Sequence, residues 1–326
     1  MKKQSEFKMK QSAFRSLLAT LFAGILIMTL VVSCSDEDGP GEMPPASITS
    51  LSISEGTAGT AVTITGKNFS AITVENKVFF GDVEAEVTGG TTTSLITTVP
   101  LGASSGPVFV QVGTATKVQG PSFTIKENLL TIHLTGVNND AEEAEEDYLS
   151  TPAGFMELTS SDLELGDIDA DFGYQYVGTR FTGVEIPKGA VVTKAYIQFT
   201  CDDTGSDPMK LRIHGETKDS GEFTADKFNI SSRTKTSANV LWDVAPWTEK
   251  DARGEAQQTA DLTEIIQEMI DHADWAEGGN MTFIFTIEEG KGGDGREAET
   301  WSAEGDEAGD DINAGEESAS LIIEYK

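Results

Sequence analysis

Cysteine and histidine are scarce in this chain of 326 residues, which has two cysteines and three histidines. The histidines, at positions 133, 214 and 272, are too far apart to form a zinc motif such as H-E-x-x-H. Two cysteines exclude a disulfide framework. Cys201 continues the inward-facing phase of an expected strand, so we interpret it as a buried apolar residue and not as a reactive thiol.

Basic residues are also few, because 23 lysines and arginines face 54 aspartates and glutamates, for a net charge of -31. A surface this negative repels the phosphates of nucleic acids and anionic lipid headgroups, so we expect no nucleic-acid partner. The acids are either a solvated surface or partly gathered into cation sites, and composition leaves both open.

The sequence offers little that resembles a catalytic centre. Gly102-Ala-Ser-Ser-Gly106 fits the pattern G-x-S-x-G, but a strand and not a helix is expected after it, which indicates a hairpin turn. Two carboxylates at the right separation hydrolyse glycosides in many enzymes, yet with 54 acids such a pair arises by chance. We therefore expect a protein that is not an enzyme, with a glycan-degrading enzyme as the weaker alternative.

One long apolar run, residues 17–32, follows several basic residues and ends in Val31-Val-Ser-Cys34. Its N-terminal position and basic flank favour a cleaved signal over a transmembrane helix. The ending resembles the lipobox of bacterial lipoproteins, which implies a signal peptide at 1–33, lipidation of Cys34 and anchoring in the outer membrane. An ordinary signal peptide is the alternative.

Residues 34–46 are rich in proline, glycine and acids and lack periodicity, which predicts a flexible tether. An acidic run directly after the cysteine resembles the surface-export signal of Bacteroidota lipoproteins. That resemblance implies exposure at the cell surface, with an outer-membrane transporter complex as a candidate partner.

Between residues 48 and 125, short β-rich runs alternate with turn residues and show no helical pattern, which predicts a small β-sandwich. Val62-Thr-Ile-Thr-Gly-Lys-Asn-Phe69 and Gly106-Pro-Val-Phe-Val110 resemble the IPT/TIG family, which has an immunoglobulin-like fold. The resemblance implies that residues 47–126 are a spacer that holds a binding domain away from the membrane.

Residues 127–326 are expected to form a larger β-sandwich. Ala195, Ile197 and Phe199 alternate with polar residues, as in a half-buried strand. Apolar residues in 261–272 fall at i, i+3, i+4 and i+7, which predicts one short helix packed on the sheets.

Several motifs of this part resemble DNRLRE and carbohydrate-binding jelly rolls of secreted bacterial surface proteins, among them Asn139-Asp-Ala-Glu-Glu143, Ser160-Ser-Asp-Leu-Glu-Leu165 and Ile230-Ser-Ser-Arg233. The predicted fold class is therefore all-β, an immunoglobulin-like β-sandwich followed by a jelly-roll β-sandwich with one short packed helix. The resemblance implies a structural calcium ion beside the first strands. Its carried-over ligands are Glu142, Glu143, Asp162 and Glu164, and a solvated acidic loop is the alternative.

A sugar-binding face needs aromatic rings that stack on pyranoses, with polar groups for the hydroxyls. Trp247 and Trp301 are expected on loops and are the candidate platforms, with Arg296 and Tyr174 as further ligand-binding candidates. The predicted function is a non-catalytic surface lipoprotein that captures polysaccharide. The alternative is an adhesion or structural surface protein that contacts protein or matrix.

Overall fold

The computed structural model describes residues 44–166, 168–169, 173–301 and 317–326. The expected signal peptide, Cys34 and most of the expected tether therefore lie outside the described residues. No helix among the described residues is long and apolar enough to cross a membrane.

Residues 47–125 form the first β-sandwich. Its strands are β1 (Ser47–Leu51), β2 (Glu55–Gly56), β3 (Ala61–Lys67), β4 (Asn76–Phe80), β5 (Val83–Ala85), β6 (Val87–Thr91), β7 (Ser94–Thr98), β8 (Gly106–Val112) and β9 (Val118–Ile125), with a short 3-10 helix η1 (Thr73–Glu75). The described strands form two sheets, in the orders β1-β3-β7-β6 and β2-β9-β8-β4-β5. Phe80 and Phe123 meet edge to face in its core, with their ring centroids 5.1 Å apart.

The described residues between 128 and 325 form the second β-sandwich. Its elements are β10 (Asn128–His133), β11 (Asp140–Ala144), β12 (Met156–Glu157), β13 (Asp162–Leu165), β14 (Ile168–Asp169), β15 (Gly173–Val184), β16 (Val192–Gln198), β17 (Cys201–Asp203), β18 (Met209–Glu216), β19 (Lys235–Val244), η2 (Glu255–Gln257), α1 (Thr263–Asp271), β20 (Gly279–Glu289), β21 (Arg296–Glu299) and β22 (Ser320–Tyr325). The prediction of an all-β chain with one short α-helix is confirmed for the described residues.

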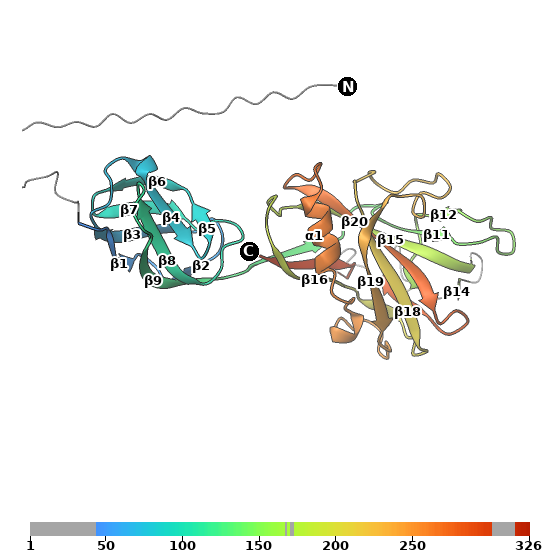
Figure 1. Cartoon of the computed structure of the whole chain (residues 1–326). Coiled ribbons are helices and arrows are strands. Elements are labelled where there is room, and N and C mark those ends of the chain that lie inside the picture. The colour runs from blue at the N-terminus through green and yellow to red at the C-terminus, as the bar shows by residue number, and fades with distance from the viewer. Residues whose placement is uncertain (1–43, 167, 170–172, 302–316) are drawn as a thin grey trace, which may run out of the picture. The chain divides into compact units, whose positions relative to one another are not determined.

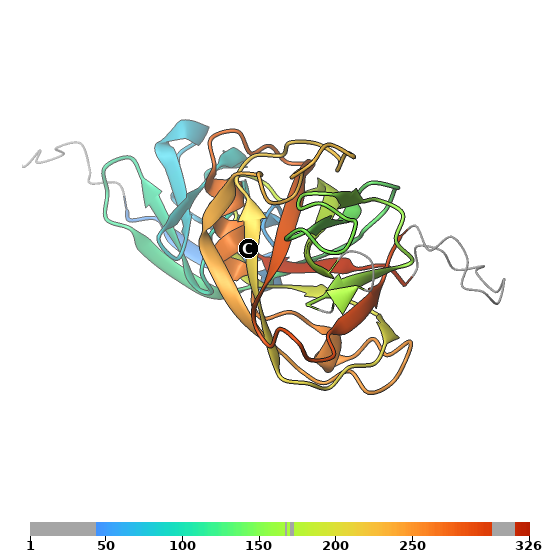
Figure 2. The ribbon, with the colours of Figure 1, turned by 90° about the vertical axis from the view of Figure 1, so that its right-hand side faces the viewer.

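The largest described sheet of this sandwich has the order β12-β11-β15-β20-β18-β19, and β14 pairs with β15. Two smaller sheets, β10-β22-β16 and β13-β21-β17, contribute to the same core. β22 pairs with β10 on one side and β16 on the other, so segments far apart in sequence lie side by side (Figure 2). As the alternating pattern predicted, Ala195, Ile197 and Phe199 are buried in this core.

Helix α1 packs against β16 and β19 (Figure 1). It buries Ile265, Ile266 and Met269, which belong to the apolar stripe that the sequence periodicity predicted, and also Ile270. Beside this stripe, Glu268 accepts hydrogen bonds from the backbone amides of Ser237 (2.8 Å) and Ala238 (2.6 Å) of β19. The helix therefore covers part of β19, the strand at one end of the large sheet.

The segment 217–235 connects β18 to β19 and covers part of the outer face of the large sheet. Phe223 and Ile230 are buried against that face together with Ala141, Met156 and Ile284, in a small second core. Gly178 lies beneath this cover, because a Cβ atom there would come within 2.5 Å of the Phe223 ring. A side chain at position 178 would push the segment off the sheet.

Candidate functional site

Trp247 does not lie on the surface, which corrects the prediction that it is a loop-borne ligand platform. Its side chain is 0% exposed and packs beside Phe199, with ring centroids 6.4 Å apart. Its indole nitrogen donates to the carbonyl of Ala256 at 2.9 Å, so the polar edge is satisfied inside the protein. The backbone of Trp247 also bridges to Gly205, and this non-local pairing turns the indole into the core.

Arg296 and Tyr174 are also buried, so neither offers the accessible ligand contact that was predicted. The guanidinium of Arg296, 1% exposed, donates to backbone carbonyls that include Ala245 (3.0 Å) and Asp207 (3.0 Å). It therefore ties loops together. The Tyr174 ring has the Lys291 amine 4.8 Å from its centroid.

Trp301 is half-buried and packs against the core. Its backbone amide donates to Oδ2 of Asp140 at 2.7 Å. The residues that follow it, 302–316, lie outside the described part of the chain. A ligand role for Trp301 stays a prediction.

A cavity of about 260 Å³ opens at one end of the outer face of the large sheet, at a place that sequence reasoning missed. The end of β18, the turn after it, the segment following α1 and the start of β20 build its walls. Half-buried Trp275 lines the cavity with Lys218, Asp219, Asp274 and Asn280. No local sequence pattern announces this site, because its walls come from segments about 60 residues apart.

The polar wall of the cavity is held rigidly. Asp219 accepts hydrogen bonds from Arg180 (Nε–Oδ1, 2.9 Å; Nη2–Oδ2, 3.1 Å), from Asn280 (Nδ2–Oδ2, 2.8 Å) and from the amide of Gly221 (3.0 Å). Burial opposes ionisation of Asp219, but these hydrogen bonds outweigh it and lower the pKa to about 2. The carboxylate is therefore ionised at neutral pH.

The indole of Trp275 is fixed as well, because its nitrogen donates to the carbonyl of Ile186 at 3.0 Å. At the rim, Lys218 and Asp274 form an exposed ion pair at 3.6 Å. An aromatic surface beside a carboxylate, an amide and an exposed ion pair can pack against an apolar ring face and hydrogen-bond hydroxyl groups.

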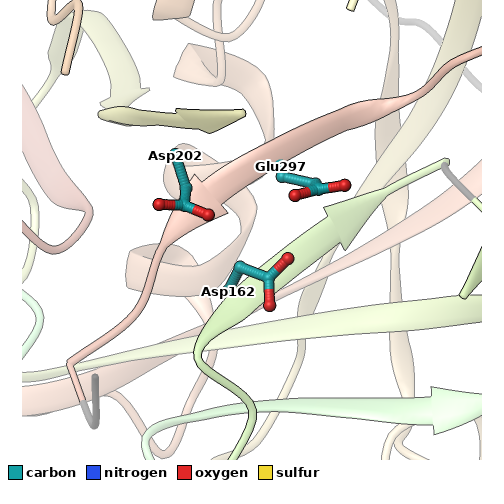
Figure 3. A group of neighbouring side chains, drawn as sticks. All are labelled: Asp162, Asp202 and Glu297. Carbon is teal, nitrogen blue, oxygen red and sulfur yellow. The ribbon is translucent and has the colours of Figure 1, made fainter. Parts of the chain in front are cut away.

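A second grouping of polar residues lies in the sheet β13-β21-β17. Figure 3 shows Asp162, Asp202 and Glu297 converging from these three strands, and one carboxylate oxygen of each lies within 4.8 Å of the others. On neighbouring strands Asp162 stands opposite Glu299, so like charges face each other. Burial and the neighbouring Asp202 raise the pKa of Glu299 to about 8. A cation or protons would relieve this repulsion.

The carried-over calcium ligands do not form a single set. Glu142 is buried next to Glu164, whose amide donates to Glu142 Oε1 at 2.6 Å, and burial followed by this neighbour raises the pKa of Glu142 well above its usual range. Glu143, the next residue on β11, points to the opposite face of the sheet. There it accepts hydrogen bonds from the amides of Ile230 (2.7 Å) and Ser231 (2.8 Å). Glu143 therefore does not share an ion with Glu142, which corrects the predicted ligand set.

Residues 46–125 match the IPT/TIG domain family. This part of the chain is an IPT/TIG domain. The prediction of an immunoglobulin-like IPT/TIG domain is thereby confirmed. No curated protein matches the chain.

Among solved structures, the chain is similar to an auxiliary nutrient binding protein of Bacteroides thetaiotaomicron (17% identity, TM-score 0.27, covering 43% of this chain and 36% of that one). It is also similar to an auxiliary nutrient binding protein of Bacteroides ovatus (21% identity, TM-score 0.26, covering 66% of this chain and 51% of that one). A third similar structure is SGBP-B from a complex xyloglucan utilization locus in Bacteroides uniformis (15% identity, TM-score 0.23, covering 78% of this chain and 70% of that one). The chain spans about a third of the first of these structures. With every TM-score below 0.5, the likeness assigns no ligand to this chain.

Proposed function

We propose that this protein is a non-catalytic carbohydrate-binding lipoprotein of the bacterial outer membrane, exposed at the cell surface. The observation that carries the proposal is the cavity lined by Trp275. It joins an aromatic ring to fixed hydrogen-bonding groups, which is the chemistry that one sugar unit of a polysaccharide requires. In this proposal Cys34 carries the lipid anchor, and the IPT/TIG domain is the spacer.

The division of labour within the cavity follows from its contacts. Trp275 offers the stacking surface. Asp219, held by Arg180, and Asn280, which donates to Asp219, are polar groups whose positions are already fixed. Such preorganisation reduces the entropy lost on binding. Lys218 rearranges at little cost, because an exposed ion pair contributes about 0–1 kcal/mol.

We also retain calcium in the proposal, as a structural ion, with revised ligands. Asp162, Asp202 and Glu297 offer hard carboxylate oxygens, and their mutual spacing within 4.8 Å is compatible with Ca–O distances of about 2.4 Å. Their neighbour Glu164 would lie beside the ion. The ion would neutralise facing carboxylates and fix the strands, without taking part in chemistry.

The test is affinity electrophoresis of the purified protein in gels that contain neutral or acidic polysaccharides, followed by calorimetry with the best ligand. We expect retention by one glycan class and at least a tenfold loss of affinity in Trp275→Ala. Because that change also removes a hydrogen bond to Ile186, Lys218→Ala with Asp274→Ala provides a second variant that touches only exposed groups.

The matched control is Tyr196→Ala. Tyr196 is a half-buried aromatic on β16 with the Lys194 amine 5.2 Å from its ring centroid, away from the cavity. Retention by no polysaccharide, or equal affinity in all variants, would overturn the proposal. Retention of cell-envelope proteins in its place would favour the adhesion alternative.

A further inference from the structure

Two loops of the second sandwich carry exposed apolar side chains that the fold does not bury. Leu149 (80% exposed) and Phe155 (37%) lie in the β11–β12 connection, and Phe228 (46%) lies in the segment 217–235. Among the described phenylalanines and tryptophans, Phe155 and Phe228 are the exposed ones. Their position on loops and not on a sheet face means that core packing does not explain them.

The backbone holds two of these side chains in an unfavourable conformation. Leu149 and Phe228 have positive φ angles, 49° and 65°. The other described non-glycine residues with positive φ are Asn68, Asn138 and Asp251, types that tolerate this region. A large apolar residue there loses stability relative to glycine or asparagine, so local folding does not account for the residue type at 149 or 228.

The Phe228 ring is firmly placed. Its amide donates to the carbonyl of Gly154 at 3.0 Å, and its carbonyl accepts from the amide of Ser232 at 3.1 Å. The ring lies on the backbone of Gly154, where a Cβ atom would come within 2.5 Å of it. The two loops therefore contact each other, and Phe228 lies against Gly154, the residue directly before Phe155.

The surroundings of these rings are polar and mostly acidic. Glu146, Asp147 and Asp226 are exposed on the same loops, with Lys227 as the nearby base. Acids repel a lipid surface of negative charge and nucleic-acid phosphates. Three apolar side chains are also too few for a stable protein interface, which takes roughly 800 Å² from each partner.

We propose that Phe228, with Phe155 beside it, is a second stacking platform, which binds a neutral polysaccharide. Sugars offer apolar C–H faces to a ring and hydroxyl donors to carboxylates, and this combination matches rings on loops that also carry the exposed Asp147 and Asp226. This inference rests on the proposed carbohydrate binding and adds a contact outside the Trp275 cavity. An acidic glycan binds more weakly at this platform than a neutral one of similar size.

The experiment compares the purified protein with Phe228→Asn and Phe228→Gly, by affinity electrophoresis and calorimetry on a panel of neutral and acidic polysaccharides. Both replacements suit a positive φ, so we expect each variant to keep its melting temperature while its affinity for the neutral ligand falls at least fivefold. Leu241→Asn, a replacement of an exposed apolar residue on β19 (41% exposed), is the control and keeps wild-type affinity.

The outcomes separate the two hypotheses. Loss of binding in Trp275→Ala with unchanged binding in Phe228→Asn would overturn the platform and leave the proposed function standing. Loss of binding in Phe228→Asn with unchanged binding in Trp275→Ala would support the platform and overturn the Trp275 cavity as the binding site. If the wild-type protein retains no polysaccharide, both fall, and a cell-envelope protein captured by the wild type but not by Phe228→Asn would make this a protein-binding surface.

Discussion

Arg180 and Asp219 are joined by two parallel hydrogen bonds, 2.9 and 3.1 Å long, between the large sheet and the segment that covers its outer face. Arg180 has 7% of its side chain exposed and Asp219 30%. Asn139 accepts from the same guanidinium at 2.8 Å. The pair thus couples the sheet to the wall of the Trp275 cavity.

Asp219→Asn should lower stability and change its dependence on pH. The folded-state pKa of Asp219, about 2, lies below the usual aspartate value of 3.8, so its contribution to stability is present above about pH 4 and is lost as pH falls through 2. We expect a loss of about 1 kcal/mol at pH 7, since solvent partly screens the pair. Urea unfolding at pH 7 and pH 2.5 measures this, and an equal difference at both pH values would contradict it.

Glu216→Gln should destabilise the protein by about 3 kcal/mol, because it leaves the buried guanidinium of Arg233 without its counter-charge. The two side chains are 1% and 3% exposed and lie 2.9 Å apart. The double variant Glu216→Leu with Arg233→Met should lose less stability than the sum of the losses of Glu216→Leu and Arg233→Met made singly. A double-mutant cycle in urea measures the coupling, and additive losses would refute it.

Trp247→Ala should cost about 4 kcal/mol of stability, since the side chain fills the core beside Phe199. Trp247→Phe should cost less, because it keeps most of the apolar volume while losing the bond to Ala256. Guanidinium unfolding gives the values. A stable Trp247→Ala protein that had lost only glycan binding would restore the surface role expected from sequence.

Calcium should raise the melting temperature of the purified protein, and a chelator should reverse the effect. At a calcium concentration a hundred times the dissociation constant, a site present only in the folded state adds about 2.7 kcal/mol. Glu297→Gln and Asp202→Asn should abolish the response, while Asp226→Asn, an exposed acid on another segment, should retain it. A wild-type protein indifferent to calcium would remove the ion from the proposal.

Local patterns predicted the elements but not what surrounds them. Leu262, Ile265, Ile266 and Met269 fall at i, i+3, i+4 and i+7, and this spacing predicted the packed helix, because amphipathic periodicity reports directly on one buried face. The environment of Trp247 depends on a backbone bridge to Gly205, 42 positions earlier (247 − 205), which no short window contains. Burial of such a residue is a tertiary property.

The acidic residues show the same limit in another form. Asp140 to Ala144 is a strand whose five residues are all buried, although acids occupy three of its positions and a solvated acidic loop was the alternative left open by the sequence. Apolar alternation, the usual strand signal, is absent there. Once the strand is known, opposite directions for Glu142 and Glu143 follow from its period of two. The Trp275 cavity requires residues 216–219 to meet residues 269–280, which no local pattern announces.

The carboxylate of Glu268 accepts hydrogen bonds from the amides of Ser237 and Ala238, two donors on β19 at the end of the large sheet. Exposed strand edges are where folded chains recruit one another into extended β-structure, and a carboxylate partner for these donors blocks that pairing. One helical glutamate thus opposes aggregation. Glu268→Ala is a change whose first effect should be on how long the protein stays monomeric at high concentration.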